Sequence, residues 1–152
     1  MPEKFSTLKE IIDYAVEKEK EAKALYTEAA EKSENKASKE IFKKLADMEA
    51  AHEKKLSAMD LDSLGADKGE KIRDLHISEF LKEMALKPDA DFQSTLIFAM
   101  KREEHSRDFY RQMADSYAGT EAGTVLRKLA EEEQKHKYML EQIYDDEILN
   151  EN

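Results

Sequence analysis

Two Glu-x-x-His motifs in this sequence stand in matching surroundings. Residues 44–56 read KLADMEAAHEKKL, and residues 128–140 read KLAEEEQKHKYML. On a helix, the glutamate and histidine of each motif share one face with flanking leucines that are expected to enter a core. One such motif in an acid-rich chain is usually a solvated helix face. Two motifs in the same frame indicate instead that a carboxylate and an imidazole are directed inward together.

The two motifs belong to an internal repeat. When residues 11–60 are aligned with residues 95–144, ten of the fifty positions are identical. In the first copy the shared positions are Ala15, Glu19, Tyr26, Ala30, Lys44, Leu45, Ala46, Glu49, His52 and Leu56. Their partners 84 positions later are Ala99, Glu103, Tyr110, Ala114, Lys128, Leu129, Ala130, Glu133, His136 and Leu140. The repeat therefore conserves apolar stripe positions and also the polar residues that interrupt the stripes.

The repeat also separates candidate ligands from the other acidic residues. Of the three nearby glutamates in the first copy, only Glu19 has an acidic counterpart, Glu103. Glu132 is set aside because it aligns with a methionine. Asp47 and Glu131 do recur, but each lies two residues from the glutamate of its motif, about 200° around the helix. We expect those two to be solvated surface charges.

Counting along the helices places the inward-facing polar groups at one level. Glu19 lies 16 residues before a turn near Asn35, and Glu49 lies 14 residues after it. At 1.5 Å per residue, these positions are about 24 and 21 Å from the end of the hairpin. Glu103 and Glu133 repeat the same count around the second turn. In two antiparallel hairpins, the four glutamates and both motif histidines are therefore expected to converge.

Four carboxylates gathered in an apolar core must either take up protons or surround cations, because a buried unpaired charge is costly. Four negative charges balance two divalent ions, and each ion obtains one imidazole, with positions left open for water, peroxide or dioxygen. Oxygen and imidazole ligands suit iron, with manganese or zinc as alternatives. The predicted metal ligands are Glu19, Glu49, His52, Glu103, Glu133 and His136. His76 and His105 fall outside this set.

Tyr26 and Tyr110 lie seven residues after Glu19 and Glu103, and so share the ligand face one layer away. One interpretation is that both are ordinary core tyrosines. The other is that each hydroxyl orients a ligand carboxylate and supports catalysis, including by supplying an electron.

Apolar periodicity predicts an all-α fold with four long helices. A capping box, Thr7-x-x-Glu10, opens the first helix. The third is expected from about Asp91 to about Tyr117. The breaks between helices are expected at 33–36, 61–91 and 118–120. The long central connection contains a short amphipathic segment, 78–86, which is expected to form an extra helix.

The composition narrows the class of protein. The chain has 152 residues, which is most simply one domain over 1–152. Its net charge of -10 argues against binding to nucleic acid or an anionic membrane. No segment has the apolar length of a signal peptide or a membrane span, so a cytoplasmic location is expected. The absence of cysteine excludes disulfides, iron–sulfur clusters and rubredoxin-type iron sites within the chain.

At the level of these motifs, the sequence resembles the rubrerythrin branch of the ferritin-like superfamily. The resemblance covers about 130 residues through AVEKEKEAKALY, KLADMEAAH, AMKREEHSRDFY and KLAEEEQKH. It implies a ferritin-like four-helix bundle with a long crossover, 61–91, between helices two and three. It also implies the same six ligands around two iron ions. The family's further glutamate, one turn after the third-helix ligand, is Ser106 here, so the site is expected to be more symmetric.

The resemblance implies an enzyme that reduces hydrogen peroxide, or dioxygen, in oxidative-stress defence. Because the rubredoxin module is missing, the electrons are expected from an external donor such as rubredoxin. A homodimer is also expected. The alternative is a ferritin-like ferroxidase that oxidises and handles iron, and a metal-stabilised scaffold without turnover is a third interpretation.

Overall fold

The computed structural model describes residues 8–59 and 90–149, and every regular element in those ranges is helical. The long helices are α1 (Leu8–Lys32), α2 (Lys36–Ser57), α3 (Phe92–Ser116) and α4 (Glu121–Tyr144). A short π-helix, η2 (Asp145–Leu149), follows α4 directly. The prediction of an all-α four-helix bundle is confirmed.

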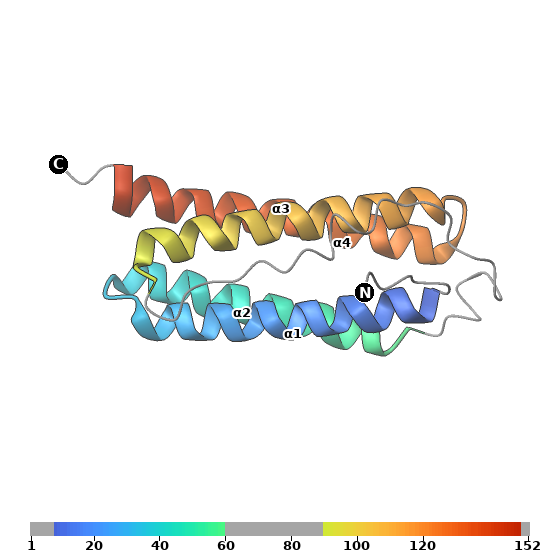
Figure 1. The fold of residues 1–152 in the computed structure, drawn as a ribbon, viewed down its shortest axis with the longest axis horizontal. Coiled ribbons are helices and arrows are strands. Elements are labelled where there is room, and N and C mark those ends of the chain that lie inside the picture. The colour runs from blue at the N-terminus through green and yellow to red at the C-terminus, as the bar shows by residue number, and fades with distance from the viewer. Residues whose placement is uncertain (1–7, 60–89, 150–152) are drawn as a thin grey trace.

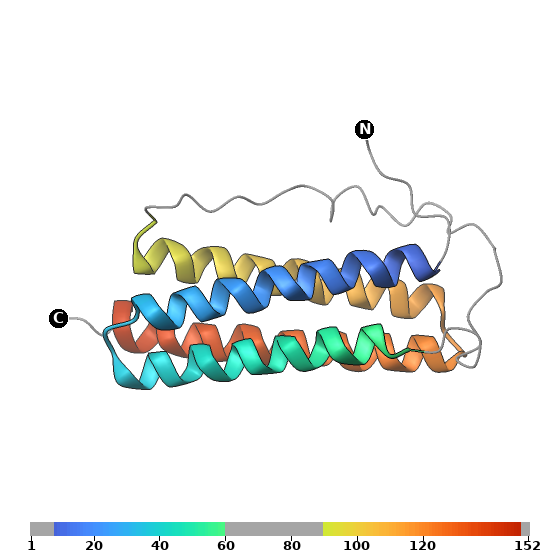
Figure 2. The same ribbon diagram turned by 90° about the horizontal axis from the view of Figure 1, so that it is seen from below.

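The four helices lie side by side along one axis as two antiparallel hairpins, α1 with α2 and α3 with α4 (Figure 1). The hairpins pack on each other through α1 against α3 and α2 against α4. Their turns lie at opposite ends of the bundle, as both views show (Figures 1 and 2). Consequently α2 ends far from where α3 begins, in agreement with a long crossover. The predicted extra helix at 78–86 and the Thr7 cap lie outside the described residues.

Short polar side chains set the helix boundaries. The side chains of Asn35, Asp91 and Thr120 each accept a hydrogen bond from the backbone N–H three residues later, which caps α2, α3 and α4. Between α3 and α4, Gly119 adopts a φ of 87°, a conformation that glycine reaches without strain. The breaks predicted at 33–36 and 118–120 are confirmed.

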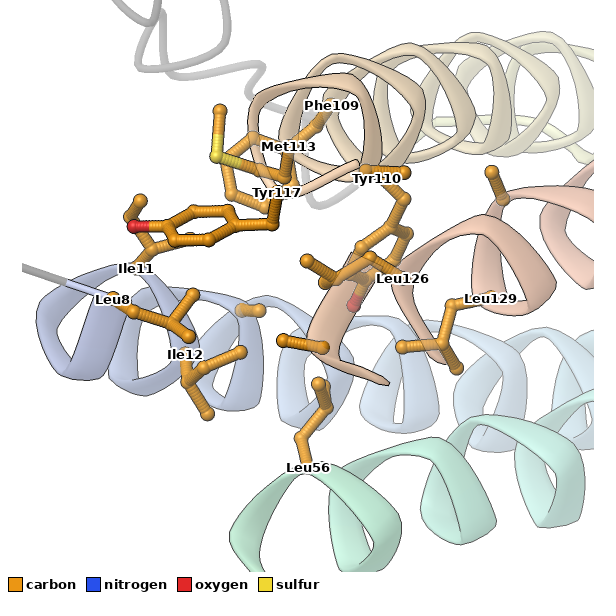
Figure 3. Close-up of a cluster of buried hydrophobic side chains, with 14 residues drawn as sticks. Leu8, Ile11, Ile12, Leu56, Phe109, Tyr110, Met113, Tyr117, Leu126 and Leu129 are labelled. Atoms are coloured by element: carbon orange, nitrogen blue, oxygen red, sulfur yellow. The ribbon is translucent and has the colours of Figure 1, made fainter. Parts of the chain in front are cut away.

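The apolar stripes form two clusters that lie on either side of the bundle's midpoint. One cluster joins the start of α1 to the α3–α4 turn and includes Ile11, Met113 and Leu126 (Figure 3). The other joins the α1–α2 turn to the start of α3 and includes Phe42 and Leu96. On each helix, the polar residues that interrupt the stripe fall between the two clusters. The fold therefore provides one polar layer enclosed by apolar packing.

The exposed surface agrees with the sequence analysis. Asp47 and Glu131 are exposed, as predicted. Within the described ranges, none of the helices has the length and hydrophobicity that crossing a bilayer requires.

Candidate metal centre

All four long helices contribute to the polar layer near their middles. Each of the six predicted ligands is buried, with no more than 3% of its surface exposed. They are Glu19 on α1, Glu49 and His52 on α2, Glu103 on α3, and Glu133 and His136 on α4. Helices α1 and α3 each contribute one glutamate to the cluster, and α2 and α4 each contribute a Glu-x-x-His motif, so each hairpin supplies the same three groups.

The imidazole of His52 faces three of the carboxylates. Its Nδ1 lies 3.1 Å from Glu133 Oε1, 3.3 Å from Glu49 Oε1 and 3.5 Å from Glu19 Oε2. The Glu133 carboxylate comes from the opposite hairpin. The two hairpins therefore contact each other through His52 and Glu133 as well as through apolar packing.

His136 makes the contacts that are equivalent under the repeat. Its Nδ1 lies 3.0 Å from Glu49 Oε1, 3.4 Å from Glu133 Oε1 and 3.7 Å from Glu103 Oε2. The two imidazole rings are nearly parallel, at 15°, with centroids 5.3 Å apart. Glu49 and Glu133 thus lie between both histidines, whereas Glu19 and Glu103 each approach one. Donor atoms of Glu49, His52, Glu133 and His136 all lie within 4.8 Å of one another, a grouping that could hold a metal ion.

The donor set fits metal ions better than it fits a hydrogen-bond network. Across the described residues, seven buried polar atoms of this layer have no hydrogen-bond partner. They are Glu19 Oε2, Glu49 Oε1, His52 Nδ1, Glu103 Oε2, both carboxylate oxygens of Glu133, and His136 Nδ1. Buried polar groups are nearly always paired, so an inward-facing cluster of such atoms calls for another partner. Carboxylate oxygens and imidazole nitrogens together are suitable ligands for iron, manganese or zinc.

Without a metal ion, burial perturbs the proton affinities of the cluster. Burial and the negative charge of Glu133 raise the pKa of Glu103 to about 8, against the opposing effect of His136. Burial and the charges of Glu133 and Glu49 likewise raise the pKa of Glu19 well above its ordinary range. Glu103 therefore favours protonation at neutral pH, and Glu19 is shifted in the same direction, as expected where anions are crowded in an apolar core.

The pKa values of the two histidines are also raised, in their case by the neighbouring carboxylates and against the effect of burial. Burial alone would lower the pKa of His136, but the neighbouring carboxylates of Glu103, Glu133 and Glu49 outweigh it and raise the pKa to about 12. The pKa of His52 is raised in the same way, against the effect of burial. In the metal-free protein the imidazolium groups partly balance the carboxylates. Divalent ions would replace that proton charge.

Tyr26 and Tyr110 contact the cluster across the hairpin interface. The Tyr26 hydroxyl donates a hydrogen bond of 2.5 Å to Glu103 Oε1, and the Tyr110 hydroxyl donates one of 2.8 Å to Glu19 Oε1. Tyr110 projects from α3 towards α1 and its ring is part of the first apolar cluster (Figure 3). In both carboxylates, the oxygen that accepts from tyrosine is Oε1, and the oxygen without a hydrogen-bond partner is Oε2. Each tyrosine therefore holds one oxygen and leaves the other directed at the histidines.

One contact of the cluster was missed by the sequence analysis. Glu132 Oε1 lies 3.4 Å from His52 Nε2, on the far side of the ring from the carboxylate cluster. The repeat gives Glu132 no acidic counterpart, because the equivalent residue in the first copy is Met48. The sequence did contain a signal, because Glu132 directly precedes Glu133. One residue corresponds to about 100° around the helix, which turns the Glu132 side chain towards the neighbouring helix.

The remaining predicted positions fall as follows. His105 is exposed on α3 and takes no part in the cluster, as predicted. His76 lies outside the described residues. Ser106 is partly buried on α3.

The comparison with protein families gives a match that spans nearly the whole chain. Residues 10–144 match the sequence model named Rubrerythrin. The chain belongs to the rubrerythrin family. Curated proteins and solved structures gave no match. All six cluster residues and both tyrosines lie within the part of the chain that matches the rubrerythrin family, so the resemblance drawn from the motifs is confirmed at family level.

Proposed function

We propose that this protein reduces hydrogen peroxide, or dioxygen, at a dinuclear iron centre with four glutamate and two histidine ligands. The observation that supports the proposal is the convergence of inward-facing carboxylate oxygens and imidazole nitrogens without hydrogen-bond partners. Membership of the rubrerythrin family supports the same reaction class.

The two halves of the cluster indicate how the residues would hold the ions. Glu19 with His52 would hold one ion, and Glu103 with His136 would hold the other, since these pairs approach each other within 3.5 and 3.7 Å. Glu49 and Glu133 lie near both histidines and would be shared between the ions. Six donors around two ions leave coordination positions for an oxidant. Four carboxylates also balance the charge of two divalent ions.

The reaction needs two electrons and two protons for each hydrogen peroxide molecule, which yields two water molecules. Two bound ferrous ions would supply the electrons, one each. The residues of the chain would position the ions and exclude bulk water, because the apolar clusters enclose the polar layer on both sides. Tyr26 and Tyr110 would keep Glu103 and Glu19 oriented throughout turnover.

The oxidised centre must then be reduced by a separate electron donor. The sequence contains no cysteine to hold a rubredoxin-type iron centre of its own. An external protein such as rubredoxin would therefore return the electrons. We also expect the protein to act as a homodimer, which sedimentation equilibrium would measure.

Stopped-flow mixing tests the reaction. The anaerobic diferrous protein is mixed with hydrogen peroxide or with dioxygen, and formation of the ferric absorption is followed. Peroxide should react much faster, and the protein should then turn over when rubredoxin and its reductase are added. A His105→Ala variant, changed at an exposed position, serves as the matched control for the His52→Ala and His136→Ala variants.

A second measurement addresses the iron-handling alternative. After excess Fe(II) is added in air, iron per chain and particle size are determined. The proposal predicts a limit near two ions per chain in a small particle. A faster reaction with dioxygen combined with iron accumulating far beyond two per chain would identify a ferroxidase instead.

A further inference from the structure

The two halves of the cluster have the same donor residues but differ in what surrounds their histidines. His52 has a carboxylate at its second ring nitrogen, because Glu132 Oε1 lies 3.4 Å from Nε2. Glu132 is on α4, whereas His52 is on α2 of the other hairpin. The Glu132 side chain is 34% exposed, so it bridges the buried ring and the solvent.

The half of the cluster that contains His136 lacks a residue equivalent to Glu132. The position equivalent to Glu132 in the first copy is Met48, 84 residues earlier. Met48 is partly buried and packs against the second apolar cluster. Among the described residues, no carboxylate contacts His136 Nε2, since all ion-pair contacts of that ring are made by Nδ1. A thioether is at most a weak hydrogen-bond acceptor, so it cannot substitute for the carboxylate.

We propose that Glu132 is a positioning residue for His52 and makes the half of the centre containing His52 bind a divalent ion more tightly than the half containing His136. This inference depends on the metal centre proposed above. It goes beyond that centre, because the six donors alone are symmetric under the repeat and predict two equal halves.

The physical reason lies in the tautomer of the imidazole. A carboxylate that accepts a hydrogen bond from Nε2–H keeps the proton on Nε2 and leaves the Nδ1 lone pair for the metal. It also holds the ring plane and makes Nδ1 a stronger donor. Nδ1 of His52 is the atom that faces Glu19, Glu49 and Glu133, so the interaction with Glu132 reinforces the orientation that the centre requires. Loss of such an outer partner typically lowers metal affinity about 10- to 100-fold.

Zn²⁺ titration of the metal-free protein tests the inference without depending on redox activity. Calorimetry in competition with a chelator of known affinity should resolve a tighter and a weaker site in the unaltered protein. Glu132→Gln should weaken the tighter site by about 10-fold or more. Glu131→Gln is the matched control, because it makes the same change of charge one residue away at an exposed position. It should leave both affinities unchanged. Met48→Glu should strengthen the weaker site, because it puts a carboxylate at the position that the repeat makes equivalent to Glu132.

Two histidine variants test whether Glu132 acts on Zn²⁺ affinity through His52. In His136→Ala protein, which keeps His52, adding Glu132→Gln should still weaken Zn²⁺ binding about 10-fold or more. In His52→Ala protein the same addition should have no effect. Circular dichroism on every variant checks that the helices are retained.

The outcomes distinguish this inference from the proposed function. Equal effects of Glu132→Gln in both histidine backgrounds, or an effect no larger than that of Glu131→Gln, would overturn the role of Glu132 and leave the metal centre intact. Failure to bind Zn²⁺ at all would overturn both. Normal, unequal Zn²⁺ binding without peroxide reduction would overturn the proposed reaction alone.

Discussion

The hydroxyl of Tyr26 on α1 donates a hydrogen bond of 2.5 Å to Glu103 on α3, a residue 77 positions later in the chain. Tyr110 on α3 returns the same contact to Glu19 on α1. Each hairpin therefore orients a carboxylate of the other hairpin. The contacts are buried, where an unpaired carboxylate oxygen would be costly.

Replacing Tyr26 or Tyr110 with phenylalanine should destabilise the protein by about 1–3 kcal/mol, because each change leaves a buried carboxylate oxygen without its donor. Urea unfolding of the metal-loaded variants would measure the loss. Tyr138→Phe is the control, since Tyr138 is 60% exposed. If all three variants unfold at the same urea concentration, the hydroxyls are not important for stability.

Replacing His52 or His136 with alanine should lower the metal content, because each change removes the nitrogen donor of one half of the centre. Elemental analysis after loading with iron should give about two ions per chain for the unaltered protein and fewer for either variant, from the counting of donors. His105→Ala should retain the full content, because His105 is exposed and away from the cluster. Loss of metal from the His105 variant would contradict the assigned ligands.

Removing the metal should lower the melting temperature at pH 7. Ions that bind the folded chain and not the unfolded chain stabilise it by mass action, by about 2.7 kcal/mol per site at a free concentration of 100 times the Kd. For a chain of this size, that corresponds to roughly 5 °C or more. Calorimetric scans with and without Zn²⁺ would measure the shift. The same melting temperature in both states would contradict a buried centre.

The metal-free protein should lose stability as the pH rises from mildly acidic to mildly alkaline. The pKa of Glu103 is raised from 4.5 to about 8 in the folded state. A raised pKa means that the folded state binds the proton more tightly, so the stabilisation is complete below pH 4.5 and is lost as the pH approaches 8. The pKa of His136, raised from 6.5 to about 12, continues the decline above pH 6.5.

Urea unfolding of the metal-free protein at pH 5, 6.5 and 8 would measure this dependence. Glu103→Gln cannot titrate at that position, so its stability should vary less between pH 5 and 8. Glu131→Gln controls for the general effect of a less negative chain, because Glu131 is exposed. A decline of equal size in both variants would mean that the titration of Glu103 does not cause it.

The sequence was sufficient for the helices and for the choice of the six cluster residues. Helix formation depends on local spacing, so the turn near Asn35 and the start of the third helix near Asp91 could be placed from the sequence alone. The structure then shows that both residues cap their helices. The repeat then distinguished Glu19 from Glu17 and Glu21, because of these three only Glu19 has an acidic counterpart in the second half. These inferences require no knowledge of which helices are neighbours.

Only the tertiary structure decided how the hairpins face each other. Counting from each turn placed the glutamates at similar distances from the ends of their hairpins, but the two turns lie at opposite ends of the bundle (Figures 1 and 2). The groups converge nonetheless because Glu19 and Glu103 lie close to the middle of their helices. The direction of hairpin packing depends on contacts between residues far apart in sequence, which periodicity along one helix does not contain.

The contacts between hairpins followed from that packing. The expectation that the tyrosines orient carboxylates did not specify which ones, and the structure pairs Tyr26 with Glu103 across the interface. The contact of Glu132 with His52 could not be found from the repeat, because Met48 breaks the symmetry at that position. A repeat reveals what both halves share, whereas a contact that only one half makes depends on the three-dimensional arrangement of neighbouring helices.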